Sequence, residues 1–186
     1  MVHGKPLSTL HVLPGIRDRS RGWLAAGGIL YPCALGKGGP VHRKREGDGA
    51  TPITSMAVLG GLWRADRGIL PASRVRLTPI RPWDGWCDDP SDGRYNRKIA
   101  LPAACGHEVL TRADCLYDIV VLLDWNISSR VRGRGSAIFL HLAHEDFRPT
   151  EGCIAVSRQT MLRLLPRIGR GTVLRVRGAG TNRRLR

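Results

Sequence analysis

The chain has 186 residues, and 30 Lys and Arg against 15 Asp and Glu give it a formal net charge of +15 at pH 7. An apolar content of 42% excludes a disordered chain, while 23 Gly and 12 Pro exclude a helical bundle, a coiled coil and, without a repeat, collagen. We therefore expect a single domain over 1–186, with its core at about 10–177 and a basic tail at 178–186.

Short strands and turns dominate the expected elements, which we take in chain order. We expect strands or short apolar pieces at 10–13, 23–35 (broken at Gly27-Gly28), 56–63, 74–78, 117–125, 136–142, 153–156 and 172–176. The segments 36–50 and 83–96 are expected to be loops, and His107 lies in a predicted turn. Ser157 predicts the N-cap of a helix over 158–165. The pattern indicates a mainly β fold with minor α.

The excess positive charge favours polyanionic partners, such as nucleic acid, anionic lipid or a cell-wall polymer. The basic residues are scattered along the chain rather than gathered in one arm. We therefore interpret them as a solvated basic surface. A dedicated nucleic-acid-binding face is the alternative, although no binding motif or aromatic stacking cluster of the RRM type is present.

No stretch reaches the about 18 apolar residues that a membrane helix needs. The segment 23–35 is interrupted by Gly27-Gly28 and Pro32 and begins late for a signal peptide, so we favour a strand there.

The cysteines number five, so at least one thiol stays free in any intramolecular pairing. Their spacing contains no C-x-x-C pair, and we expect no zinc site and no other metal. The sequence leaves open whether disulfides form among Cys33, Cys87, Cys105 and Cys115.

One Cys and one His stand at strand ends that could lie side by side. His141 ends the apolar run 138–140, and Cys153 follows Gly152 at a junction between a loop and a strand. A glycine before a nucleophile permits a tight turn and close approach of a substrate. An adjacent imidazole could take the thiol proton and provide a thiolate at neutral pH.

Three motifs in the same order give the chain a family resemblance. Residues 47–52 read GDGATP, residues 137–141 read AIFLH and residues 149–154 read PTEGCI. Together they resemble the turn, the catalytic His strand and the nucleophile motif of the L,D-transpeptidase catalytic domain family (YkuD-type). The segments 85–96 and 116–121 resemble a compact bacterial subgroup of that family. The resemblance covers about residues 10–177 and implies a β-sandwich or barrel with one or two short helices.

The resemblance also implies an activity and its residues. Cys153 would attack the amide after the third, diamino-acid residue of a peptidoglycan stem, releasing D-Ala and leaving a thioester. His141 would act as general base and then acid, with one ring nitrogen held by a backbone carbonyl. The N–H groups of Gly152 and Cys153 would form an oxyanion hole. An amine of a second stem would resolve the thioester, and no cofactor is implied.

Further residues are candidates for binding the substrate. Arg148 could bind a stem carboxylate, Trp86 could cover the substrate or pack in the core, and Thr51 could contact the substrate. Thr51 and Asp48 could instead fix the turn by bonds from side chain to backbone. His144 is a rival base near His141.

Several functional alternatives remain beside the transpeptidase. An L,D-carboxypeptidase of the same fold would transfer the acyl group to water. A papain-like peptidase is disfavoured because its Cys precedes its His in the chain. The remote alternatives are a nucleic-acid-binding protein and an inactive wall-binding module. We expect a monomer that acts on peptidoglycan stem peptides in the periplasm or cell envelope.

Overall fold

A computed structural model describes residues 5–178, so the predicted tail from residue 179 onward lies outside the described residues. Within this range nine strands form one sheet, in the order β11-β12-β13-β3-β2-β1-β14-β6-β7. Their bounds are β1 (Thr9–Pro14), β2 (Arg21–Ala26), β3 (Ile29–Ala34), β6 (Ser55–Trp63), β7 (Leu77–Pro79), β11 (Ile119–Leu123), β12 (Phe139–Leu142), β13 (Ile154–Val156) and β14 (Val173–Val176).

This sheet closes on itself, because β11 pairs with β6 as well as with β12. The result is a barrel to which β7 is added along β6. Closure removes the free edges that an open sheet would expose. The predictions of a mainly β fold with minor α, and of a barrel, are confirmed.

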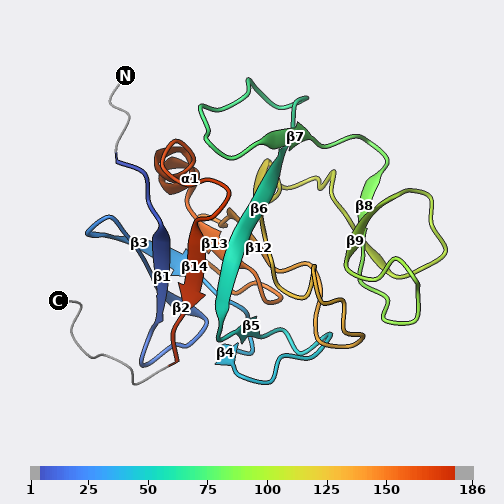
Figure 1. The fold of residues 1–186 in the computed structure, drawn as a ribbon, viewed down its shortest axis with the longest axis horizontal. Helices are drawn as coiled ribbons and strands as arrows, with labels where there is room; N and C mark the ends of the chain where they lie inside the picture. Colours follow the sequence, from blue (N-terminus) through green and yellow to red (C-terminus); the bar gives the residue numbers. More distant parts are fainter. Residues whose placement is uncertain (1–4, 179–186) are drawn as a thin grey trace.

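A smaller layer lies beside the barrel, at the right of Figure 1. It contains β8 (Asp84–Cys87), β9 (Arg97–Ala100) and β10 (His107–Val109), with β8 between the other two. A separate short pair, β4 (Pro40–Val41) and β5 (Thr51–Pro52), lies near the lower end of β6.

Four sequence predictions of local structure were wrong in part. The segment 36–50 was expected to be a loop, yet the short strand β4 forms within it. The segment 83–96 is not all loop, since β8 forms there, and His107 begins β10 rather than lying in a turn. β8 was not predicted because its sequence contains residue types that are common in turns. In the structure, Asp84 of this strand is buried and its carboxylate pairs with the ammonium of Lys98 at 3.0 Å. The strand expected over 74–78 is limited to Leu77–Pro79.

The strands β11 and β12 are apolar at nearly every position because both of their faces are covered. Ile138, Leu140 and Leu142 belong to the core inside the barrel. Phe139 belongs to a second cluster with Trp86 on the opposite face. The continuous apolar runs thus reflect a three-layer arrangement and not a single buried face.

The helix α1 (Arg158–Leu164) is the one helix in the described part of the chain, and it lies beside the upper ends of β13 and β14 (Figure 1). Ser157 caps it, since its hydroxyl accepts a hydrogen bond from the N–H of Thr160 at 3.2 Å. Met161 and Leu164 pack into the barrel core. No helix within residues 5–178 combines the length and the apolar character that crossing a membrane requires.

Candidate active site

A cavity of about 370 Å³ lies against the outer face of β12 and β13. Its walls come from the turn after β4, the ends of β8 and β10, and the loops on either side of β12. The residues used below that line it are Lys44, Glu46, Asp88, Glu108, Arg112, Tyr117, Ser136, Ala137, His141, His144, Arg148, Thr150 and Cys153.

The register of two parallel strands brings His141 and Cys153 to one face. His141 lies opposite Ala155 in the β12–β13 pair. Because side chains alternate along a strand, Cys153, two residues before Ala155, lies on the same face as His141. Both line the cavity, so the structure brings together the two residues that the sequence singled out.

Two backbone groups hold the sulfur of Cys153. Sγ donates to the carbonyl oxygen of Ala137 at 3.0 Å and accepts from the N–H of Phe139 at 3.3 Å. Burial, and next the charge of Glu108, raise the pKa of the Cys153 thiol to about 12. The expectation of a thiolate at neutral pH is therefore wrong for the resting protein, because desolvation opposes the charged form.

His141 is held by its own strand. Its Nδ1 lies 2.8 Å from the carbonyl oxygen of Leu142, the kind of acceptor that the sequence resemblance implies. Nε2 is then the nitrogen left for proton exchange with a substrate. Burial lowers the pKa of His141 to about 4, so the imidazole is neutral at physiological pH. The edge of the Tyr117 ring packs on it, with 5.2 Å between ring centroids.

Two threonines fix the turn before the nucleophile. The hydroxyl of Thr51 accepts from the N–H of Gly36 at 2.9 Å and donates to the carbonyl of Gly152 at 3.0 Å. The hydroxyl of Thr150 donates to the carbonyl of Cys153 at 2.7 Å. Gly152 has φ +139°, and a Cβ there would lie 2.8 Å from a backbone oxygen, so the turn requires glycine.

The other predicted residues occupy different places. Trp86 is buried, donates from its indole N–H to Asn96 at 3.0 Å and does not line the cavity. Thr51 acts on the turn as described and also lies outside the cavity lining. Arg148 is exposed and lines the cavity, where its guanidinium lies 3.1 Å from Nδ1 of His144.

Asp48 fixes the turn that the sequence assigned to it. Its carboxylate accepts from the backbone N–H groups of Arg45 and Ala50 at 2.7 and 2.9 Å. It also accepts from the buried ammonium of Lys44 at 2.5 Å. The prediction that Asp48 stabilises this turn through its side chain is confirmed.

Sequence reasoning missed several charged residues that line the cavity. Glu46, Asp88, Glu108 and Arg112 come from three separate segments, and no spacing rule connects them. One signal was available: Asp88 lies in the segment 85–96 that carries the resemblance, and Glu46 directly precedes the motif at 47–52. Glu108 and Arg112 carry no such signal, because only the pairing of β10 with β8 brings them to the cavity.

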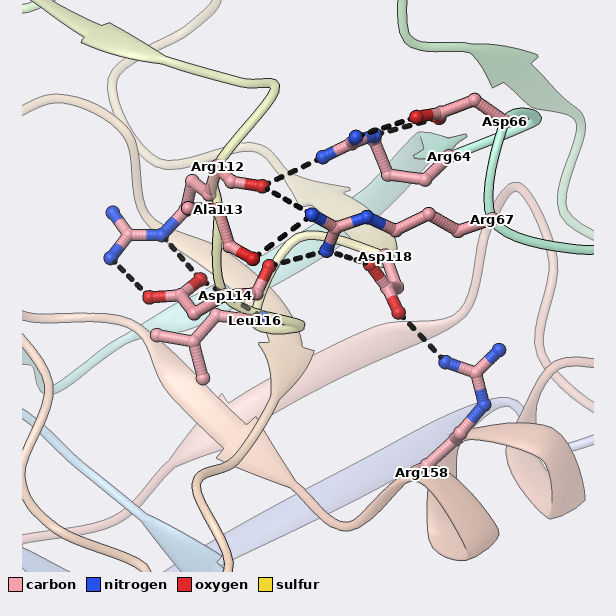
Figure 2. Close-up of polar contacts among 9 residues, drawn as sticks. All are labelled: Arg64, Asp66, Arg67, Arg112, Ala113, Asp114, Leu116, Asp118 and Arg158. Carbon is pink, nitrogen blue, oxygen red and sulfur yellow. Dashed lines mark hydrogen bonds and ion pairs between the residues drawn. The ribbon is translucent and has the colours of Figure 1, made fainter.

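An arginine network anchors the loop between β10 and β11, which supplies one wall of the cavity (Figure 2). The guanidinium of Arg67 donates to the carbonyls of Arg112, Ala113 and Asp114 at 2.7–3.0 Å. It also pairs with Asp118, which in turn pairs with Arg158 at the start of α1. The network ties this wall to β6 and to the helix.

One group of side chains could be considered for a metal ion. Within the described residues, Sγ of Cys87 and of Cys105 and a carboxylate oxygen of Asp92 lie within 4.8 Å of one another. The guanidinium of Arg94 forms two bonds to Asp92 and lies 3.5 Å from Sγ of Cys105. A fixed positive charge thus stands beside the group, and all five cysteines of the chain are free thiols.

Comparison with known proteins identifies the family. The family model of the L,D-transpeptidase catalytic domain (YkuD) matches residues 16–176. A similar solved structure is that of Mycobacterium tuberculosis L,D-transpeptidase 1, at 15% identity and a TM-score of 0.40. The match covers 91% of this chain and 62% of that one, so this chain spans less than two thirds of that structure. Curated proteins yield no match. From the family match over most of its length, the chain belongs to the YkuD family of L,D-transpeptidase catalytic domains.

Proposed function

We propose that this protein is a peptidoglycan L,D-transpeptidase whose nucleophile is Cys153. The observation that supports this most directly is the common placement of Cys153 and His141 on one face of two parallel strands, lining one cavity. The carbonyl of Leu142 occupies Nδ1 of His141 and leaves Nε2 as the proton acceptor. The family to which the chain belongs consists of enzymes of this class.

The reaction begins from a neutral thiol and a neutral imidazole. As Sγ of Cys153 attacks the amide carbonyl after the third stem residue, its proton passes to His141. The imidazolium then protonates the leaving nitrogen of D-Ala, and a thioester remains. An amine of a second stem attacks the thioester, loses a proton to His141 and restores the thiol.

The developing oxyanion needs donors next to the sulfur. The backbone N–H of Cys153 is the first candidate. The N–H of Gly152 already donates to the hydroxyl of Thr150 at 3.2 Å, so it would have to exchange that long bond for the oxyanion. Arg148, exposed at the cavity, is proposed to bind the carboxylate of the departing D-Ala.

Mass spectrometry after incubation with a carbapenem tests the nucleophile. A single covalent adduct is expected on Cys153, absent from Cys153→Ala and slower to form in His141→Ala. Cys33→Ala serves as the matched control, because that thiol is buried inside the barrel core and should not change the adduct. Labelling that persists in Cys153→Ala would refute the assignment.

Analysis of the products identifies the acceptor. With purified tetrapeptide stems, transpeptidation yields cross-linked dimers, whereas the carboxypeptidase alternative yields tripeptides alone. We propose the cell envelope as the place of action, because that is where peptidoglycan stems occur. Detection of the protein only in cell fractions without peptidoglycan would contradict that location.

A further inference from the structure

Three carboxylates line the cavity of a protein that is otherwise strongly basic. Glu46 follows β4, Asp88 follows β8 and Glu108 lies in β10, and all three line the cavity beside Cys153. Glu46 accepts a hydrogen bond from Tyr95, and Glu108 accepts one from Tyr117 at 2.6 Å. The phenols orient two of the carboxylates without neutralising them.

The carboxylates act on one another. Burial, and then the charge of Glu46, raise the pKa of Asp88. Burial raises the pKa of Glu108 as well, and the charges of Asp88 and Glu46 add to that shift. The bond from Tyr117 and the charge of Arg112 oppose it. Gathering negative charge in this way costs free energy unless a cation compensates for it.

The neighbouring cations are largely committed elsewhere. Lys44 pairs with Asp48, and Arg112 forms two bonds to Asp114 at 2.9 and 2.8 Å. His107 lowers the pKa of Asp88 slightly by its charge, but its Nδ1 lies 2.7 Å from the carbonyl of Cys105. Within the described residues none of the three carboxylates forms a salt bridge. A ligand with a positive charge would therefore compensate for their negative charge.

A second observation also points to a polar ligand. The hydroxyl oxygen of Ser136 is buried and lines the same cavity, and within residues 5–178 it makes no hydrogen bond of good geometry, although the Tyr95 hydroxyl lies near it. Buried hydroxyls are rarely left unpaired, because an unmade bond costs free energy. A group with several N–H donors would serve both the carboxylates and this hydroxyl.

We propose that Glu46, Asp88, Glu108 and Ser136 form a subsite for a primary ammonium group of a peptidoglycan stem. The inference rests on the proposed function and specifies its substrate. The ammonium could belong to the side chain of the donor's diamino acid or to the acceptor that resolves the thioester. In both cases the ammonium donates its N–H groups to carboxylates of this cavity, which also contains Cys153.

The test separates the two half-reactions of the enzyme. Donor acylation of Cys153 is followed by mass spectrometry, with a tetrapeptide stem and with the same stem acetylated on its side-chain amine. Aminolysis is followed separately, by adding an amine stem to the pre-formed acyl-enzyme. The variants are Asp88→Asn and Glu108→Gln, and Glu145→Gln is the matched control, an exposed acid outside the cavity lining.

Each outcome has one meaning. If the donor provides the ammonium, KM for the free stem rises about tenfold or more in both variants, and the acetylated stem is a poor substrate that the variants do not worsen. If the acceptor provides it, aminolysis slows by a similar factor while donor acylation is retained. Glu145→Gln should match the wild type in both half-reactions. Variants equal to wild type in both, with no preference against the acetylated stem, would overturn the subsite.

Failure of the subsite is distinguishable from failure of the proposed function. A carbapenem adduct that forms on Cys153 in both wild type and Asp88→Asn shows that the nucleophile works. If the half-reactions with stems are then unchanged in the variants, the enzyme is retained and only the subsite is removed. No adduct in the wild type removes the proposed function itself. Melting curves check the fold, and Asp88→Asn should leave it intact because Asp88 is only partly buried and forms no salt bridge within the described residues.

Discussion

Replacing Thr51 by Val should uncouple the nucleophile turn from the barrel. The Thr51 side chain is fully buried, and its hydroxyl bonds both the N–H of Gly36 and the carbonyl of Gly152. Valine has nearly the same shape but can make neither bond. The substitution therefore leaves one donor and one acceptor unpaired in a dry part of the structure.

The expected loss of stability follows from those two groups. An unpaired buried polar group costs about 1–3 kcal/mol, so two cost about 2–6 kcal/mol. The additional methyl of valine offsets about 1 kcal/mol of this. Thr51→Ser keeps the hydroxyl and loses only a methyl, at a cost of about 1 kcal/mol. At the middle of these ranges, valine should therefore be the more destabilising of the two by roughly 2 kcal/mol.

Urea denaturation of the two variants measures this difference, and carbapenem acylation of Cys153 measures the effect on the site. We expect Thr51→Val to acylate more slowly than Thr51→Ser, because the carbonyl of Gly152 is then no longer held. Equal midpoints for the two variants, or a destabilised Thr51→Val that acylates at the wild-type rate, would refute the role given to these bonds.

Four further predictions address the site and its supports. Gly152→Ala should lose about 2 kcal/mol or more of stability in urea, and most of its rate of acylation by a carbapenem. The reason is that φ is +139° there and that a backbone oxygen lies 2.8 Å from the new Cβ. Wild-type stability and rate would show that the turn adapts to alanine. Alkylation of Cys153 by iodoacetamide, followed by peptide mapping, should keep accelerating above neutral pH, since burial raises its pKa to about 12; a plateau near neutrality would indicate a resting thiolate. His141 has its pKa lowered by burial from 6.5 to about 4, so the unfolded chain binds its proton more tightly. The stability that comes from burying a neutral His141 is complete above about pH 6.5 and is lost as pH falls toward 4. In His141→Gln, the midpoint of urea denaturation should therefore depend less on pH over that range. Arg67→Met should cost about 1–3 kcal/mol and speed amide exchange in 112–118, whereas Arg158→Met, which removes one exposed ion pair, should cost under about 1 kcal/mol; equal effects would show that the bonds to the carbonyls add nothing.

The sequence predicted those elements whose residue pattern follows from burial. The runs at 119–123 and 139–142 are apolar at nearly every position because barrel core and outer layer cover both faces, and strands buried in this way can be recognised locally. Ser157 identified the start of α1 because capping is a local interaction. β8 was missed, since Asp84 and Gly85 are turn formers whose burial depends on partners distant in the chain.

The sequence predicted the part of the candidate site that depends on strand alternation, and missed the part that depends on contacts between distant segments. Cys153 and His141 stand twelve residues apart in the sequence, and strand alternation then places them on one face. The sequence offered Thr51 and Trp86 as candidates for binding the substrate, because the segments that contain them could be recognised. It could not show their hydrogen-bond partners in the folded chain. The carboxylates of Glu46 and Glu108 belong to segments that only the folded chain brings together.

The ionisation of Cys153 and His141 shows why proximity alone is not enough to predict chemistry. An imidazole next to a thiol favours an ion pair in water, yet both groups lie beneath the layer of β8 and β10, where burial penalises each charged form. The charges of Lys44 and Arg112 lower the pKa of Cys153, but both side chains are also paired with carboxylates. Burial, together with the negative charge of Glu108 near the sulfur, outweighs them. Proton transfer from Cys153 to His141 then becomes favourable only when a substrate carbonyl develops negative charge against backbone donors. For the function proposed above, the thiol of Cys153 would therefore lose its proton during attack on the substrate and not beforehand.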